Sequence, residues 1–195
     1  MMTRARVGCA VLVVVGLAVG GCVPLRGMRQ VPAERVGVKP PADQAAIVFM
    51  HAARRGGTTS LFELRGSPDR FIGLLVTDTR LVHLTAPGRT RFMVIGRHAS
   101  FLDAELQAGK TYDVAVLDGP DVDEPFVLRP VTPADARPII QHCVASCAWV
   151  ENTEKSEEWA RKQWTSIQRK KEHDLPKWES RANRPMLKAT DGRTP

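Results

Sequence analysis

Two cysteines in the C-terminal third of the chain could carry chemistry. Cys143 and Cys147 are four residues apart, and on a helix this spacing brings the Cα atoms to about 6 Å, within the range that a disulfide spans. We expect a structural disulfide here. Two free buried thiols, a metal site shared with His142, and redox catalysis are the alternatives, although a redox pair is normally spaced C-x-x-C.

The histidines do not form a recognisable ligand set. They are spread over the chain, and none has a partner at metal-ligand spacing; they are His51, His83, His98, His142 and His173. His83 alternates out of phase with Val82 and Leu84, which predicts that it lies on the solvent face of a strand. The sequence therefore predicts no metal site and no cofactor.

Motifs typical of catalysis are also missing from the sequence. It contains no G-x-S-x-G nucleophile turn, and no P-loop or dinucleotide-binding glycine pattern. The acidic stretch 118–124 (DGPDVDE) resembles a calcium-binding loop in charge only, because it lacks the EF-hand positions. We interpret it as a solvated loop and expect a protein that is not an enzyme.

The first residues of the chain have the composition of a secretory signal. A basic start, Met1–Arg6, is followed by the uncharged segment Val7–Gly21 and then by Cys22. This order predicts a signal peptide over residues 1–21. An uncleaved membrane anchor is the alternative, but four glycines and Pro24 make this segment a poor transmembrane helix.

Residues 19–22 (VGGC) resemble the bacterial lipobox, in which the cysteine is diacylated and becomes the first residue of the mature protein. This resemblance implies that Cys22 carries the lipid, including palmitate. Val23 stands where an aspartate would retain a lipoprotein at the inner membrane, so the outer membrane, facing the periplasm, is the implied location. In that oxidising compartment Cys143 and Cys147 are the remaining thiols and are expected to pair.

The middle of the chain consists of short segments with alternating polarity. Residues 22–43 contain four prolines and no apolar period, which predicts a linker. Residues 44–131 contain about eight short strand patterns separated by turns, which indicate a mainly β fold. We predict an antiparallel β-sandwich of about seven to eight strands, with a closed barrel as the alternative. Phe92 and Tyr112 are expected in its core, and Met93 on the opposite, wet face.

Two turn motifs resemble those of a family of small bacterial lipoproteins whose β-sandwich domain has no assigned function. Residues 86–90 (APGRT) look like its proline-glycine turn followed by a basic residue. Residues 106–112 (LQAGKTY) look like its aGKTYY signature, with Asp113 in place of the second tyrosine. The resemblance implies a β-sandwich on the cell envelope and no catalytic residue.

The C-terminal part of the chain has a different character. Residues 132–150 form a connector that holds the two cysteines, and residues 181–195 are predicted to be a flexible tail. Between them, residues 151–180 form a basic amphipathic helix, because its inner positions recur at steps of three and four. These positions are Ala160, Trp164, Ile167, Lys171, Leu175 and Trp178.

The net charge of +7, to which Arg4 and Arg6 contribute two, favours anionic surfaces without selecting one. We expect a lipid-anchored, non-catalytic binding or scaffolding module, with the membrane and an envelope protein as partners and no nucleic acid. The alternative is a binder of anionic membranes or polysaccharides through Arg169, Lys170 and Lys171. An envelope enzyme is the third hypothesis.

Overall fold

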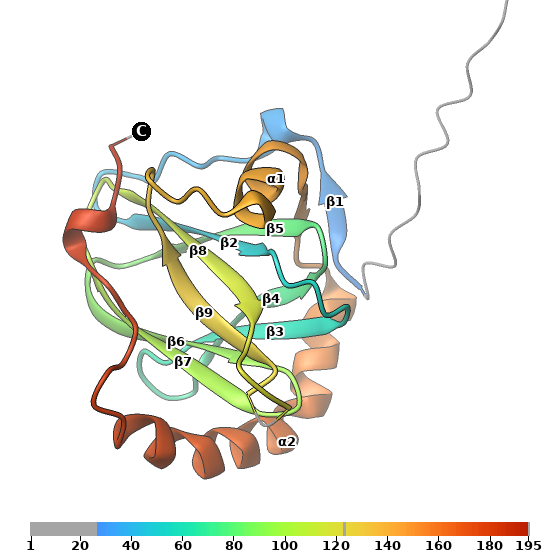
Figure 1. The fold of residues 1–195 in the computed structure, drawn as a ribbon. Helices are drawn as coiled ribbons and strands as arrows, with labels where there is room; N and C mark the ends of the chain where they lie inside the picture. Colours follow the sequence, from blue (N-terminus) through green and yellow to red (C-terminus); the bar gives the residue numbers. More distant parts are fainter. Residues whose placement is uncertain (1–26, 123, 195) are drawn as a thin grey trace, which may run out of the picture.

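The computed structural model of the protein describes residues 27–122 and 124–194. Two mixed β-sheets face each other, and each has a helix on its outer side (Figure 1). The six-stranded sheet has the order β1 (Arg29–Val31), β10 (Ala148–Glu151), β5 (Thr79–Thr85), β2 (Ala45–His51), β8 (Thr111–Asp118) and β9 (Phe126–Val131). The five-stranded sheet has the order β11 (Met186–Leu187), β7 (Ala99–Leu106), β6 (Gly88–Ile95), β3 (Thr58–Glu63) and β4 (Arg70–Val76).

The main core lies between the two sheets, because strands of both direct alternate apolar side chains into it. Phe49 of β2 and Phe92 of β6 meet edge to face, with ring centroids 5.2 Å apart. Tyr112 lies in the same core, and its hydroxyl oxygen accepts a hydrogen bond from the backbone N–H of Gln107 at 2.9 Å. The predicted core positions Phe92 and Tyr112 are confirmed.

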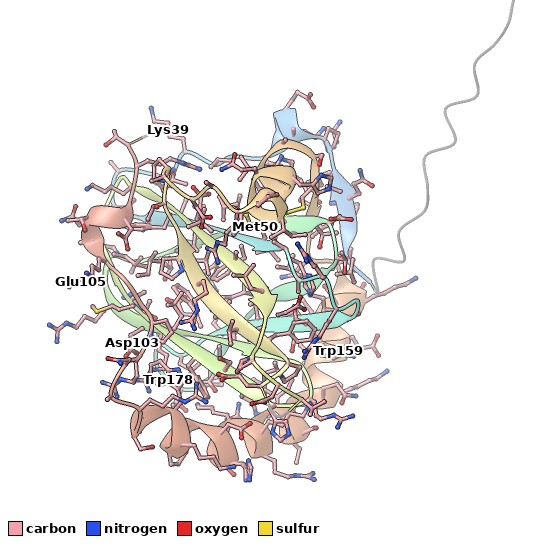
Figure 2. The ribbon with its side chains drawn as sticks, viewed as in Figure 1. Lys39, Met50, Asp103, Glu105, Trp159 and Trp178 are labelled. Carbon is pink, nitrogen blue, oxygen red and sulfur yellow. A yellow bond between two sulfur atoms is a disulfide. The ribbon has the colours of Figure 1, made fainter. Side chains whose placement is uncertain are left out.

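Helices cover the outer face of each sheet. On the six-stranded sheet, α1 (Pro138–Ser146) packs Ile140 into a cluster with Met50. On the five-stranded sheet, α2 (Glu154–Glu179) packs Ile167 and Trp178 into a cluster with Met93. Met50 and Trp178 lie between sheet and helix on the two opposite sides of the molecule (Figure 2). Many strands therefore bury both faces.

The prediction that Met93 lies on a wet face is wrong, because its side chain is 0% exposed. Strand alternation gives the correct side of the sheet for Met93, opposite to Phe92. The sequence pattern predicts that this side faces solvent. In the structure, α2 covers both Met93 and the neighbouring Phe101 of β7. Two apolar faces on one strand are typical of a sheet that is packed on both sides.

Two packed sheets with a C-terminal helix agree with the expected fold, but the expected antiparallel pairing is wrong in three places. The pairs β2–β8, β10–β5 and β11–β7 are parallel. Residues 44–131 form eight strands, β2 to β9, which confirms the expected number, and the described residues form eleven strands in all. The extra strands β1, β10 and β11 come from outside residues 44–131 and add to strands of the two sheets. β2 and β8 can pair in parallel because the chain between them crosses to the other sheet, through β6 and β7.

The predicted linker and tail are partly built into the domain. Met28 is buried in the main core, and β1 pairs with β10. The short helix η1 (Ala33–Arg35) follows. At the other end, Leu187 of β11 is fully buried, η2 (Ala189–Asp191) follows, and Arg193 forms a bridge with Thr111. These segments lack an apolar period because each contributes only one or two core side chains.

The predicted signal peptide, Cys22 and residues 22–26 of the predicted linker lie outside the described residues. Among the helices that the structure does describe, none is both long enough and apolar enough to cross a bilayer.

Candidate functional site

A buried glutamate, Glu63, has the ionisable side chain that a catalytic site would need, but its contacts are structural. Glu63 of β3 is bonded to His83 Nε2 at 2.8 Å, to the Thr85 hydroxyl at 2.6 Å and to the Thr90 hydroxyl at 3.0 Å, and Arg65 lies at 3.2 Å. Burial alone would raise its pKa, but these hydrogen bonds outweigh burial and lower the pKa to about 2. The carboxylate therefore stays ionised and enclosed, which is a structural role.

The prediction that His83 lies on the solvent face is wrong, because its side chain is buried. Its side chain points between the sheets, in phase with Leu81. The apolar Val82 and the partly exposed Leu84 face outward instead, and Val82 packs against the cluster beneath α1. Alternation shows which residues share a face, but here the more apolar pair lies on the outer face.

His51 is a second enclosed ionisable group. It ends β2, and its ring lies 5.5 Å from the ring of Phe126, centroid to centroid. Neither ring nitrogen has a hydrogen-bond partner among the described residues. Burial disfavours the charged imidazole and lowers its pKa to about 4. His51 is thus neutral at physiological pH and inaccessible to a ligand.

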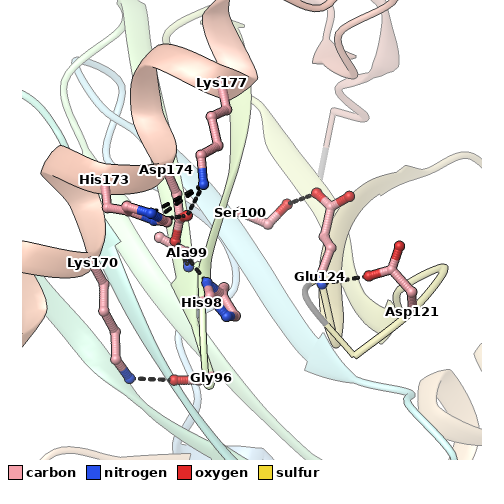
Figure 3. Close-up of polar contacts among 10 residues, drawn as sticks. All are labelled: Gly96, His98, Ala99, Ser100, Asp121, Glu124, Lys170, His173, Asp174 and Lys177. Carbon is pink, nitrogen blue, oxygen red and sulfur yellow. Dashed lines mark hydrogen bonds and ion pairs between the residues drawn. The ribbon is translucent and has the colours of Figure 1, made fainter.

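The accessible cluster is formed by His98, His173 and Asp174, and we take it as the candidate site (Figure 3). His98 lies in the turn between β6 and β7, whereas His173 and Asp174 are consecutive on α2. His98 Nδ1 is 3.5 Å from one Asp174 oxygen, and His173 Nδ1 is 2.7 Å from the other. One donor atom from each residue lies within 4.8 Å of the other two.

Two contacts hold the turn against the helix and so position the cluster. The backbone N–H of Ala99 donates to Asp174 at 2.8 Å, and the Lys170 ammonium donates to the carbonyl of Gly96 at 2.6 Å (Figure 3). Burial alone would raise the pKa of Asp174, but the Ala99 and His173 hydrogen bonds and the nearby imidazoles lower it. Asp174 therefore supplies a fixed negative charge beside two imidazoles.

Charged side chains surround a cavity of about 300 Å³ next to the cluster. Lys177 Nζ lies 3.1 Å from His173 Nε2 and 3.9 Å from an Asp174 oxygen. Glu124 accepts from Ser100 at 2.9 Å and from Arg181 at 2.9 Å, so this carboxylate is engaged elsewhere. Two imidazoles and one carboxylate are a donor set that transition metals use.

The sequence gives little local indication of this cluster. His98 is 75 residues from His173, and only the packing of α2 on the β6–β7 turn brings the two together, with ring centroids 6.2 Å apart. The adjacent pair His173–Asp174 is the one hint, and it becomes informative when the third donor is known.

The predicted cysteine pair is joined in the structure. A disulfide links Cys143 and Cys147, with Cα atoms 4.5 Å apart. Cys147 follows the last helical residue and has extended backbone angles, so the second cysteine does not belong to a regular helix. His142 instead contacts Ser146 and lies 3.7 Å from Asp78, and the disulfide sulfurs offer no thiolate to a metal.

The three predicted surface-binding residues differ in their surroundings. Arg169 is exposed on the outer side of α2. Lys170 is bonded to the Gly96 carbonyl, and Lys171 forms an ion pair with Asp69 at 2.6 Å. Two of the three positive charges are therefore used to fasten the helix to its own sheet.

No protein-family model matches this chain, and no curated protein matches its sequence.

Proposed function

We propose that this protein is a lipid-anchored, non-catalytic binding or scaffolding module of the cell envelope, which is held directly at the bilayer surface. The integration of Met28 and β1 into the domain carries the proposal. If Cys22 bears the lipid, five residue steps separate it from Gly27. A fully extended chain spans at most about 3.5 Å per residue, or about 17 Å in total. The tether is therefore shorter than the predicted linker.

This short tether also selects the face that meets the membrane. Gly27 lies against the first turn of α2, where a Cβ atom at Gly27 would be 3.3 Å from Lys155 Cβ. The Thr153 hydroxyl donates to the Gly27 carbonyl. The start of α2 and the adjoining edge strand β1 are thus the parts nearest the anchor, on the side of the molecule away from Glu105 (Figures 1 and 2).

Two further observations support the proposal. The glycines of the two motifs that resemble a lipoprotein family have positive φ angles: Gly88, the first residue of β6, has a φ of 97°, and Gly109, between β7 and β8, has a φ of 73°. Both angles are in the region that favours glycine. Glu63 and His51, whose pKa values are strongly lowered, are enclosed in the fold and not exposed to a bound molecule.

The exposed face of α2 gives the anionic-surface alternative little support, because its charges balance. The exposed basic residues of α2 are Lys155, Arg161, Lys162, Arg169 and Lys177, and its exposed acidic residues are Glu154, Glu157, Glu158, Glu172 and Glu179. Attraction to an anionic surface requires an excess of positive charge. The proposed module therefore depends on its lipid rather than on this helix.

Lipidation is tested by palmitate labelling with and without globomycin. The wild-type chain is expected to take up label, and Cys22→Ser is expected to leave an unlabelled, uncleaved precursor. Label that persists in the variant, or is absent from the wild type, contradicts the proposal.

Proximity to the bilayer is tested with one introduced thiol at a time, since Cys22 and the disulfide leave no other reactive thiol in the mature chain. In proteoliposomes, Lys155→Cys should react slowly with a bulky, water-soluble maleimide, and the matched variant Glu105→Cys should react fast. Ten Gly/Ser residues inserted after Val23 should restore the reaction at position 155. Equal rates at both positions before the insertion contradict the short tether.

A further inference from the structure

We propose that His98, His173 and Asp174 form a binding site for a divalent transition-metal ion such as Zn²⁺. The first argument is the convergence of three different donors from two elements, all within 4.8 Å of one another. Ligands around tetrahedral zinc lie about 3.3 Å apart, given bond lengths of about 2.0–2.1 Å. The separation of 3.5 Å between His98 Nδ1 and Asp174 is already close to this value.

The second argument is that the carboxylate is fixed in place. Asp174 is buried and its oxygen accepts the Ala99 N–H at 2.8 Å, which orients the group as outer hydrogen bonds orient metal ligands. The Lys170–Gly96 bond at 2.6 Å restrains the turn that carries His98. The His173 side chain is 58% exposed, so it can rotate to complete the site with little loss of packing.

The third argument concerns Lys177, which lies where a cation would be attracted. Its ammonium is 3.1 Å from His173 Nε2 and 3.9 Å from Asp174. The Lys177 side chain is 62% exposed and extends from the same helix, so it is free to swing into solvent. Without metal, Lys177 offsets the charge of Asp174; with metal, the ion takes over that role and Lys177 leaves. Lys177 therefore competes with the metal.

The donor set selects among ions. Two imidazole nitrogens and one carboxylate oxygen suit zinc and its neighbours in the first transition row, whereas calcium and magnesium require mainly oxygen ligands. The adjoining cavity of about 300 Å³ leaves the remaining coordination position to water. Glu124, engaged by Ser100 and Arg181, is not needed as a ligand.

The experiment is a calorimetric titration of the full-length, chelator-treated protein in detergent with ZnCl₂, followed by Co²⁺ absorption to report nitrogen ligation. We expect one ion per chain. His98→Ala and His173→Ala should each weaken zinc binding by at least about tenfold. Lys177→Met should strengthen it several-fold, because the competing cation is gone. MgCl₂ should produce no binding heat.

His142→Ala is the matched control, since His142 is an exposed helical histidine outside the cluster. The zinc affinity of this variant should equal that of the wild type. Melting temperatures of all variants, measured without zinc, identify any variant that fails to fold. Such a variant is replaced by a measurement on the wild type, in which zinc should shift the imidazole NMR signals of His98 and His173. The proposal is overturned by absent zinc binding, by binding that survives both histidine changes, or by imidazole signals of His98 and His173 that do not respond to zinc.

Discussion

The ammonium group of Lys171 lies 2.6 Å from a carboxylate oxygen of Asp69, and this ion pair fastens α2 to the turn before β4. Gln168 donates to the same carboxylate at 3.1 Å. Asp69 is 8% exposed, so these two side chains take the place of water around its carboxylate. Lys171, which the sequence analysis names as a candidate for binding anionic surfaces, is thus part of the interface between α2 and its own sheet.

Replacing Lys171 should therefore destabilise the domain. Lys171→Met keeps the apolar stem but leaves the buried Asp69 carboxylate with one partner fewer, so the free energy of unfolding should fall by about 1–3 kcal/mol. Arg169 lies on the exposed side of α2, so Arg169→Met should change the free energy of unfolding by less than about 0.5 kcal/mol. Urea denaturation of both variants measures the difference. Equal stabilities would mean that Lys171 does not fasten the helix.

Met93 and Phe92 should now behave alike, although they point to opposite sides of β6. Both side chains are fully buried, one under α2 and one between the sheets. Met93→Ala should cost about 2–5 kcal/mol and Phe92→Ala about 3–5 kcal/mol. Glu105→Ala, at an exposed position of β7, is the control and should be nearly neutral. A nearly neutral Met93→Ala would show that α2 does not cover this face.

Acid should destabilise the protein in two successive, slightly overlapping pH windows. The pKa of His51 is about 4 in the folded state against an ordinary 6.5. Between these values the unfolded chain binds more protons, so stability falls as the pH drops from 6.5 to 4, by about 3 kcal/mol. The pKa of Glu63 is about 2 against an ordinary 4.5, so its contribution is present above pH 4.5 and lost as the pH falls toward 2.

Two variants separate these windows in denaturation curves recorded at successive pH values. His51→Leu should flatten the dependence between pH 6.5 and 4 and leave the lower window intact. Glu63→Gln should reduce the pH dependence in the lower window, to which Asp174 also contributes. Unchanged slopes in both variants would assign acid sensitivity to other groups.

The disulfide gives a simple chemical prediction. Thiol counting on denatured, unreduced mature protein should find no free sulfhydryl, because Cys143 and Cys147 are joined. The double variant Cys143→Ala, Cys147→Ala should lose about 2 kcal/mol of stability, as expected for closure of a short loop. Two reactive thiols in the wild type would favour the buried-thiol alternative.

The sequence alone determined the local elements, because turn chemistry and alternation act over a few residues. It located the strands from β2 to β9, the core positions Phe92 and Tyr112, and the amphipathic helix whose inner stripe includes Ile167 and Trp178. It also singled out the cysteine pair, since a spacing of four is a local property.

What covers each face of a strand, and which distant residues meet, depends on the packing of the whole domain. Alternation separates Met93 from Phe92, and His83 from Val82, but it does not tell whether helix, sheet or solvent lies beyond. The same holds for the candidate metal site, because His98 and Asp174 have no relationship until α2 packs on the β6–β7 turn. Short edge strands such as β1 and β11 form for a similar reason: two or three residues have no strand preference of their own and pair where an existing sheet offers unpaired backbone groups.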